Sequence, residues 1–117
     1  IGGITGDGTY VQGVLAEASL KGARMAIHKT TENWGEPPVA TVLGISPLKS
    51  RERVEWLAEK AVELGATALA LVRCQRSEAV APKDPSRLRR LMLAAAKQCQ
   101  RSRVPDVVSW DLTDFIA

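Results

Sequence analysis

Residues 68–72 read ALALV, an uninterrupted apolar run between two segments with helical periodicity. A strand inside a parallel sheet is covered on both faces and is therefore continuously hydrophobic, whereas a strand with one solvated face alternates apolar and polar residues. We predict that this run is a buried central strand. It indicates an α/β domain built around a parallel sheet.

The segment before this run has the features of a helix between residues 50 and 65. Ser50 is a residue type that caps helix N-termini, and Gly65 is the type that commonly follows a helix C-terminus. Apolar side chains recur at helical spacing between them and predict a core-facing stripe, which contains Val54, Leu57, Ala58, Ala61 and Leu64.

A second helix is predicted after the run. Asp84 and Pro85 suit the N-cap and the first helical position. The apolar side chains beyond them again share one side of a helix, which holds Leu88, Leu91, Met92, Ala95 and Cys99. Apolar segments at 39–45 and 107–108 predict one strand before and one strand after the two helices. Right-handed β-α-β connections within a parallel sheet follow.

The chain changes character near the adjacent prolines Pro37 and Pro38. Before them, residues 10–19 and 22–35 alternate apolar and polar side chains with the period of strands. Two such strands are too few to close a barrel. We therefore predict that residues 1–38 are part of a small β-barrel or meander.

Other residues that often carry chemistry form no recognisable site. GGITGDG, residues 2–8, lacks the lysine of a phosphate-binding loop and predicts a hairpin turn. His28 lies in a predicted strand without metal-ligand partners, so we interpret it as structural. Cys74 and Cys99 have no zinc or disulfide spacing and favour a reducing, cytoplasmic setting. No apolar run approaches the roughly 20 residues of a membrane helix.

Positive charge is concentrated between residues 73 and 103. That segment holds nine Lys or Arg residues and two acidic residues, a net charge of +7 in a chain whose total is +3. At about 100° per residue, four of the cations fall on one side of the second helix, away from its apolar side. We call this set the basic ridge; it comprises Arg87, Arg90, Lys97 and Arg101, with no acidic residue among them.

Two interpretations of the basic ridge stay open. The first is a solvated helix surface. The second is a surface that binds RNA, because the planar guanidinium of arginine donates two parallel hydrogen bonds to a phosphate. Gln98, at the edge of the ridge, either contacts RNA or caps backbone groups at the end of the helix.

Several short motifs between residues 45 and 105 follow one another in an order that resembles the RsmE family. Its members are SPOUT-class methyltransferases that modify a uridine of 16S ribosomal RNA. The matching features are R-x-E at Arg53 and Glu55, K-x-x-E-L-G at residues 60–65, R-S at residues 76–77, A-x-Q at Ala96 and Gln98, and the later Pro105.

The resemblance implies a fold and a reaction. Residues 39–117 are expected to be the first part of a parallel-sheet SPOUT-like domain, and residues 1–38 the end of a small PUA-like β-barrel that binds RNA. The implied reaction is N3-methylation of a uracil ring with S-adenosylmethionine as donor. The implied partners are 16S ribosomal RNA or the small ribosomal subunit and a second copy of the chain, with no membrane.

The sequence departs from the family pattern because it lacks the G-P-E-G-G loop and the segment that forms the trefoil knot. We therefore expect a longer chain in which other residues hold S-adenosylmethionine, and an inactive fragment without them. RNA binding or active-site support is expected from Arg76, Arg87, Arg90, Lys97, Gln98, Arg101 and Arg103. The alternative function is a non-catalytic RNA-binding α/β module.

Overall fold

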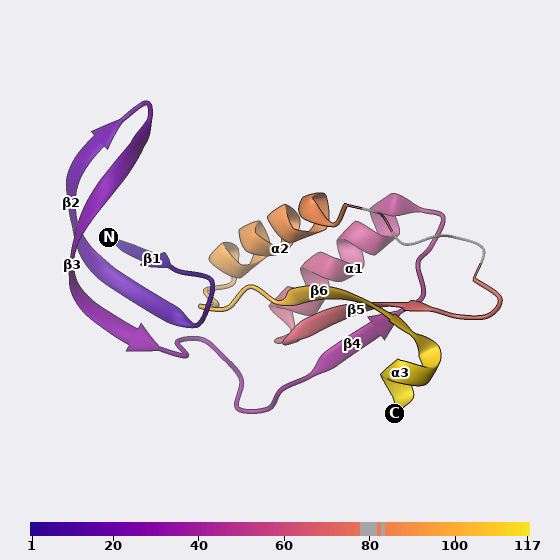
Figure 1. The fold of residues 1–117 in the computed structure, drawn as a ribbon. Helices are drawn as coiled ribbons and strands as arrows, with labels where there is room; N and C mark the ends of the chain where they lie inside the picture. The colour runs from indigo at the N-terminus through magenta and orange to yellow at the C-terminus, as the bar shows by residue number, and fades with distance from the viewer. Residues whose placement is uncertain (78–81, 83) are drawn as a thin grey trace.

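The computed structural model describes residues 1–77, 82 and 84–117. These residues form two three-stranded sheets that lie side by side along the long axis of the molecule (Figure 1). The antiparallel sheet has the order β1 (Gly2–Ile4), β2 (Thr9–Ser19) and β3 (Gly22–Glu32). The parallel sheet has the order β4 (Val42–Ile45), β5 (Ala68–Arg73) and β6 (Asp106–Asp111). Three helices accompany the parallel sheet: α1 (Arg51–Glu63), α2 (Ser86–Gln98) and α3 (Leu112–Ile116).

The predicted central strand is confirmed. β5 lies between β4 and β6 and pairs in parallel with both. Leu69 and Leu71 belong to the hydrophobic core that α1 and α2 complete, together with Val54 and Met92 on those helices. The chain therefore has the α/β fold that its apolar run predicts.

The opposite face of the parallel sheet is covered by the C-terminal segment. Successive side chains of a strand point to opposite faces, so Ala70 and Val72 point away from α1 and α2, yet both are buried. The ring of Phe115 in α3 occupies the space that a Cβ atom on Gly44 would need. Because both faces are covered, residues 69–72 of β5 are all buried, and the exposed side chain of Arg73 lies at the end of the strand.

The predicted start of α1 is confirmed, and one residue of its stripe is wrong. Ser50 is the N-cap, and its Oγ accepts a hydrogen bond from the backbone N–H of Arg53 at 3.4 Å. Gly65 has a φ of +95°, which ends the helix in a conformation that favours glycine. Leu64, predicted to face the core, is 87% exposed. It is the C-cap residue, where the chain already turns away from the helix axis.

The start of α2 is one residue later than predicted. Pro85 is the N-cap and Ser86 the first helical residue. Asp84 still contributes, because its Oδ1 accepts a hydrogen bond from the backbone N–H of Ser86 at 3.0 Å. The inward side is largely as predicted, with Leu88, Met92 and Ala95 buried.

The antiparallel sheet contains the two predicted strands and a third. Residues 2–8 were predicted as a hairpin turn, but Gly2–Ile4 pairs with β2, and the turn comprises the residues after it. β3 ends at Glu32, because Asn33 and Gly35 have positive φ values and turn the chain toward the parallel sheet.

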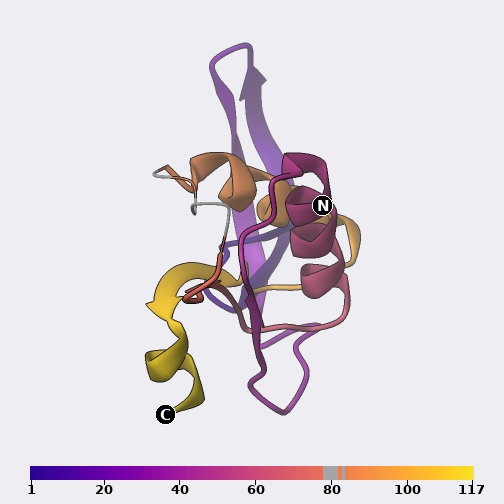
Figure 2. The same ribbon diagram turned by 90° about the vertical axis from the view of Figure 1, so that its right-hand side faces the viewer.

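The antiparallel sheet buries few side chains. Val11 is its buried hydrophobic residue, whereas large apolar side chains toward the hairpin tip are exposed, namely Val14, Leu15, Leu20 and Ile27. The hairpin of β2 and β3 projects beyond the helices (Figure 2). None of the helices in the described ranges is long and apolar enough to cross a lipid bilayer.

Candidate functional site

Three neighbouring cavities open where the parallel strands end. Pro47, two residues after β4, lines all three of them. In open α/β sheets, ligands bind at the carboxyl ends of the strands, where loops from different strands meet. The carboxyl edge of β4, β5 and β6 is therefore the candidate site.

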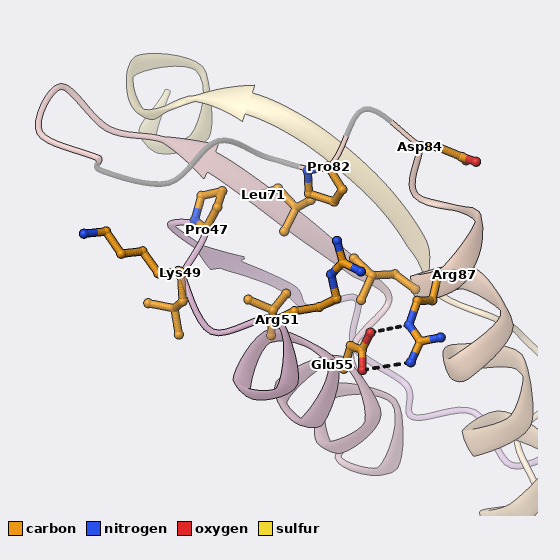
Figure 3. A pocket seen from close by; sticks show the side chains of 11 residues that line it. Pro47, Lys49, Arg51, Glu55, Leu71, Pro82, Asp84 and Arg87 are labelled. Atoms are coloured by element: carbon orange, nitrogen blue, oxygen red, sulfur yellow. Dashed lines mark hydrogen bonds and ion pairs between the residues drawn. The ribbon is translucent and has the colours of Figure 1, made fainter.

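The first cavity, which we call the helix cavity, lies between the N-terminal ends of α1 and α2 and has a volume of about 340 Å³. Glu55 and Arg87 face each other across it (Figure 3), with Nε to Oε1 at 2.5 Å and Nη2 to Oε2 at 3.4 Å. The hydrogen bond from Arg87 lowers the pKa of Glu55, so this carboxylate stays charged. The basic ridge itself holds no acidic residue, and the acidic partner of Arg87 comes from α1.

The second cavity, which we call the acidic cavity, has a volume of about 600 Å³ and lies beside the end of β6. Arg73 Nε donates a hydrogen bond to Asp111 Oδ1 at 2.8 Å, and Arg73 Nη2 lies 2.7 Å from the same oxygen in an ion pair. Asp114 adds a second carboxylate to the lining. Arg73 is thus neutralised by Asp111, and the described residues of the lining retain a negative charge.

The third cavity, which we call the basic cavity, has a volume of about 470 Å³ and is lined by Lys49, Arg53 and Arg76. Serine hydroxyls join the loops that form it. Ser46 Oγ and Ser77 Oγ are 2.8 Å apart, and the backbone N–H of Cys74 donates to Ser77 Oγ at 3.0 Å. Hydroxyls and cations therefore converge where β4 and β5 end.

Arg101 does not belong to the basic ridge. It is 4% exposed, and Nη1 donates to the carbonyl oxygens of Val62 at 3.0 Å and Ala66 at 2.8 Å. The prediction continued the 100° spacing of a helix past its end. α2 ends at Gln98, and Gln100 has a φ of +62°, which turns Arg101 inward.

Arg101 instead holds the two sheets together through Glu36. Arg101 Nη2 lies 2.7 Å from Glu36 Oε2, and the backbone N–H of Arg103 donates to Glu36 Oε1 at 2.8 Å. Burial raises the pKa of Glu36, but the hydrogen bonds from Arg101 and Arg103 lower it by more, so the net shift is downward. The Arg103 side chain is exposed and donates to Asn33 Oδ1 at 3.0 Å.

The remaining predicted residues lie at the surface. Arg90, Lys97 and Gln98 are exposed on α2, and within the described residues their side chains make no hydrogen bond or ion pair. The Gln98 side chain therefore caps no backbone group among the described residues. At the end of α2, the backbone N–H of Cys99 donates a hydrogen bond to Ala95 O. Arg76 is exposed in the loop after β5.

Two functional features were missed at the sequence level. Glu36 was not recognised as the partner of Arg101, which lies 65 positions away. Arg53 was considered only as part of a motif, although the SPLKSRER segment places several cations directly after a predicted strand. That position was the available signal, because loops after parallel strands meet at one edge.

No metal centre is present among the residues that the structure describes. No group of three or more His, Cys, Asp or Glu side chains there is arranged to hold an ion. His28 is exposed on β3.

Comparisons with known proteins agree with this arrangement of strands and helices. The family model described as an RNA methyltransferase domain matches residues 35–116. This chain therefore belongs to the RNA methyltransferase domain family. A comparison with curated proteins found no match.

Solved structures show the same fold. A probable rRNA methyltransferase from Porphyromonas gingivalis has 27% sequence identity and a TM-score of 0.88, and the match covers 100% of this chain and 49% of that one. The ribosomal RNA small subunit methyltransferase E from Neisseria gonorrhoeae, solved bound to S-adenosyl methionine, has 26% identity and a TM-score of 0.79, with 94% and 47% coverage. The chain thus spans about half the length of these structures, and it matches the RsmE family that its motifs resemble.

Proposed function

We propose that the complete protein transfers a methyl group from S-adenosylmethionine to N3 of a uridine in 16S ribosomal RNA. The observation that carries this proposal is the family match over residues 35–116, which includes the parallel sheet and its carboxyl edge. The Neisseria relative, a small-subunit ribosomal RNA methyltransferase bound to S-adenosyl methionine, supports the substrate and the methyl donor. In this proposal residues 1–38 end a PUA-like barrel and residues 39–117 begin a SPOUT-type domain.

The acidic and basic cavities do not form a complete donor site. A small-molecule pocket buries most of its ligand between largely apolar walls. In the acidic cavity, Leu71 is the buried residue among the described residues of the lining, and the basic cavity has no buried lining residue there. We therefore derive no step through S-adenosylmethionine from these residues, and we propose that residues outside this chain hold it.

The RNA-facing surface is proposed to run from the carboxyl edge along α2. Arg76, Arg90, Lys97 and Gln98 are the exposed members of the predicted set that have no protein partner among the described residues, so they are available to RNA. Arg87 and Arg103 are exposed but already paired, which makes them positioning residues. Arg101 is assigned to support, because its guanidinium is buried.

The assembly and location follow from the same proposal. A homodimer is expected from the family resemblance, and a cytoplasmic location from a ribosomal substrate. Size-exclusion chromatography with light scattering on the complete protein tests the dimer.

Methyl transfer itself provides the test. The complete protein is incubated with small-subunit RNA and S-adenosylmethionine carrying a labelled methyl group. Label should enter the RNA, and reverse transcription should stop at one uridine, because a methyl group on N3 removes the donor used in base pairing. RNA binding without label transfer would instead favour the non-catalytic module.

A further inference from the structure

The three cavities at the carboxyl edge differ in charge. Among the described residues, the lining of the acidic cavity holds one cation and two carboxylates. The helix cavity contains cations together with Glu55 and Asp84, and its Arg87 is committed to Glu55. The basic cavity has three cationic residues, and the described residues of its lining include no carboxylate. An anion placed at this edge is therefore attracted to the basic cavity.

Two arginines of the basic cavity are available for an anion. Among the described residues, the side chains of Arg53 and Arg76 make no hydrogen bond or ion pair with protein. They come from different elements, α1 and the loop after β5, so the cavity presents guanidinium groups from two directions. Two planar forks suit an oxyanion with several acceptor oxygens.

Hydrogen bonds hold the backbone around both arginines. Ser77, next to Arg76, binds Ser46 through its hydroxyl and accepts a hydrogen bond from the backbone N–H of Cys74. Ser50 Oγ accepts from the backbone N–H of Arg53. The backbone at both arginines is therefore held before any ligand binds, which lowers the entropy that binding would cost.

We propose that the basic cavity binds one phosphodiester group of the RNA substrate. This inference rests on the proposed function and adds to it the position at which the RNA backbone is held. A phosphodiester fits better than the donor's carboxylate, because the described residues that line the basic cavity include no buried apolar side chain to hold the rest of that cofactor. The neighbouring acidic cavity repels the RNA backbone, so the strand is directed across the ends of β4 and β5.

The experiment compares charge removal inside and beside the basic cavity. Arg53→Gln, Arg76→Gln and the double variant of the complete protein are titrated with a fragment of small-subunit RNA over a salt series. The matched control is Arg51→Gln, which removes the same charge from an exposed position of α1 that lines the helix cavity instead. Melting temperatures and calorimetric affinity for S-adenosylmethionine are measured on the same samples.

The double variant should lose about tenfold in RNA affinity. Its log–log salt slope should fall by about 0.7 to 0.9, the value for one phosphate that the protein no longer neutralises. Melting temperature and donor affinity should not change, and Arg53→Lys should keep the parent slope.

Three results would overturn the basic cavity as a phosphate site: an unchanged slope in the double variant, an equal loss in Arg51→Gln, or a loss of donor affinity with normal RNA binding. Failure of the parent protein to bind RNA would instead refute the proposed function.

Discussion

Arginines occupy two different environments in this chain. At the junction between the sheets, Arg101 is buried and its guanidinium contacts Glu36 and two backbone carbonyls. At the carboxyl edge, Arg53 and Arg76 are exposed beside a cavity and have no such partners in the described part of the chain. The partner of a cation, and not its place in a basic segment, therefore determines whether it supports the fold or is available to a ligand.

The largest expected effect comes from burying a carboxylate without a cation. Leu71 is 2% exposed in the core, so Leu71→Asp should cost at least about 4 kcal/mol of unfolding free energy. The carboxylate of Glu36, by contrast, is tolerated because Arg101 pairs with it. Chemical denaturation measures the loss. Leu64→Asp on the exposed end of α1 is the control and should stay within about 0.5 kcal/mol of the parent. A Leu71→Asp protein of parent stability would mean that β5 is not a buried strand.

Breaking the junction should have the next largest effect. Arg101→Ala leaves Glu36 charged, 9% exposed and without its guanidinium partner, so a loss of about 3–5 kcal/mol is expected. Arg24→Ala, at an exposed position of β3, provides the matched control. The Arg24→Ala control should unfold at the same denaturant concentration as the parent. If Arg101→Ala does so too, Arg101 does not hold the sheets together.

The Glu36 pair should also make stability depend on pH. Its pKa is lowered from the ordinary value of 4.5, so the unfolded chain takes up this proton before the folded chain does. The stabilisation is therefore complete above about pH 4.5 and is lost as the pH falls through the lower, folded-state pKa. Melting temperatures of the parent and of Glu36→Gln, measured from neutral to acid pH, should converge in acid. A constant difference between them would contradict this linkage.

The smallest effects are expected on α2. Arg90→Gln with Lys97→Gln should leave the melting temperature unchanged and lower the log–log salt slope of RNA binding by about 0.7 to 0.9 for each phosphate that these side chains neutralise in the parent. Gln98→Ala should leave the slope intact, because an amide releases no counterion. An unchanged affinity and slope in the double variant would make this part of the ridge a solvated surface.

The sequence predicted those features that depend on neighbours along the chain. Continuous apolarity identified the central strand, and the residues at 50 and 65 marked the ends of α1 because caps act locally. The wrong or missing predictions concern the end of a helix and a contact between residues far apart in the sequence. Helical spacing misplaced Arg101, because the left-handed conformation of Gln100 is not encoded by a glycine, and Glu36 reaches the pair from another part of the chain.

The basic cavity could not be predicted as a unit for the same reason. Arg53 and Arg76 follow different strands, and only the parallel pairing of β4 with β5 brings these two segments together. The sequence did place both residues in family motifs. It therefore identified the two arginines, but it did not show that they line the same cavity.

The most direct test measures stability and RNA binding on the same samples for the two kinds of arginine. Arg101→Gln and the Arg53→Gln, Arg76→Gln double variant of the complete protein are compared by melting temperature and by the salt slope of RNA affinity below both melting transitions. We predict a lower melting temperature with the parent slope for Arg101→Gln, and a parent melting temperature with a reduced slope for the double variant. A reduced slope for Arg101→Gln together with a parent slope for the double variant would contradict the assignment of both sites.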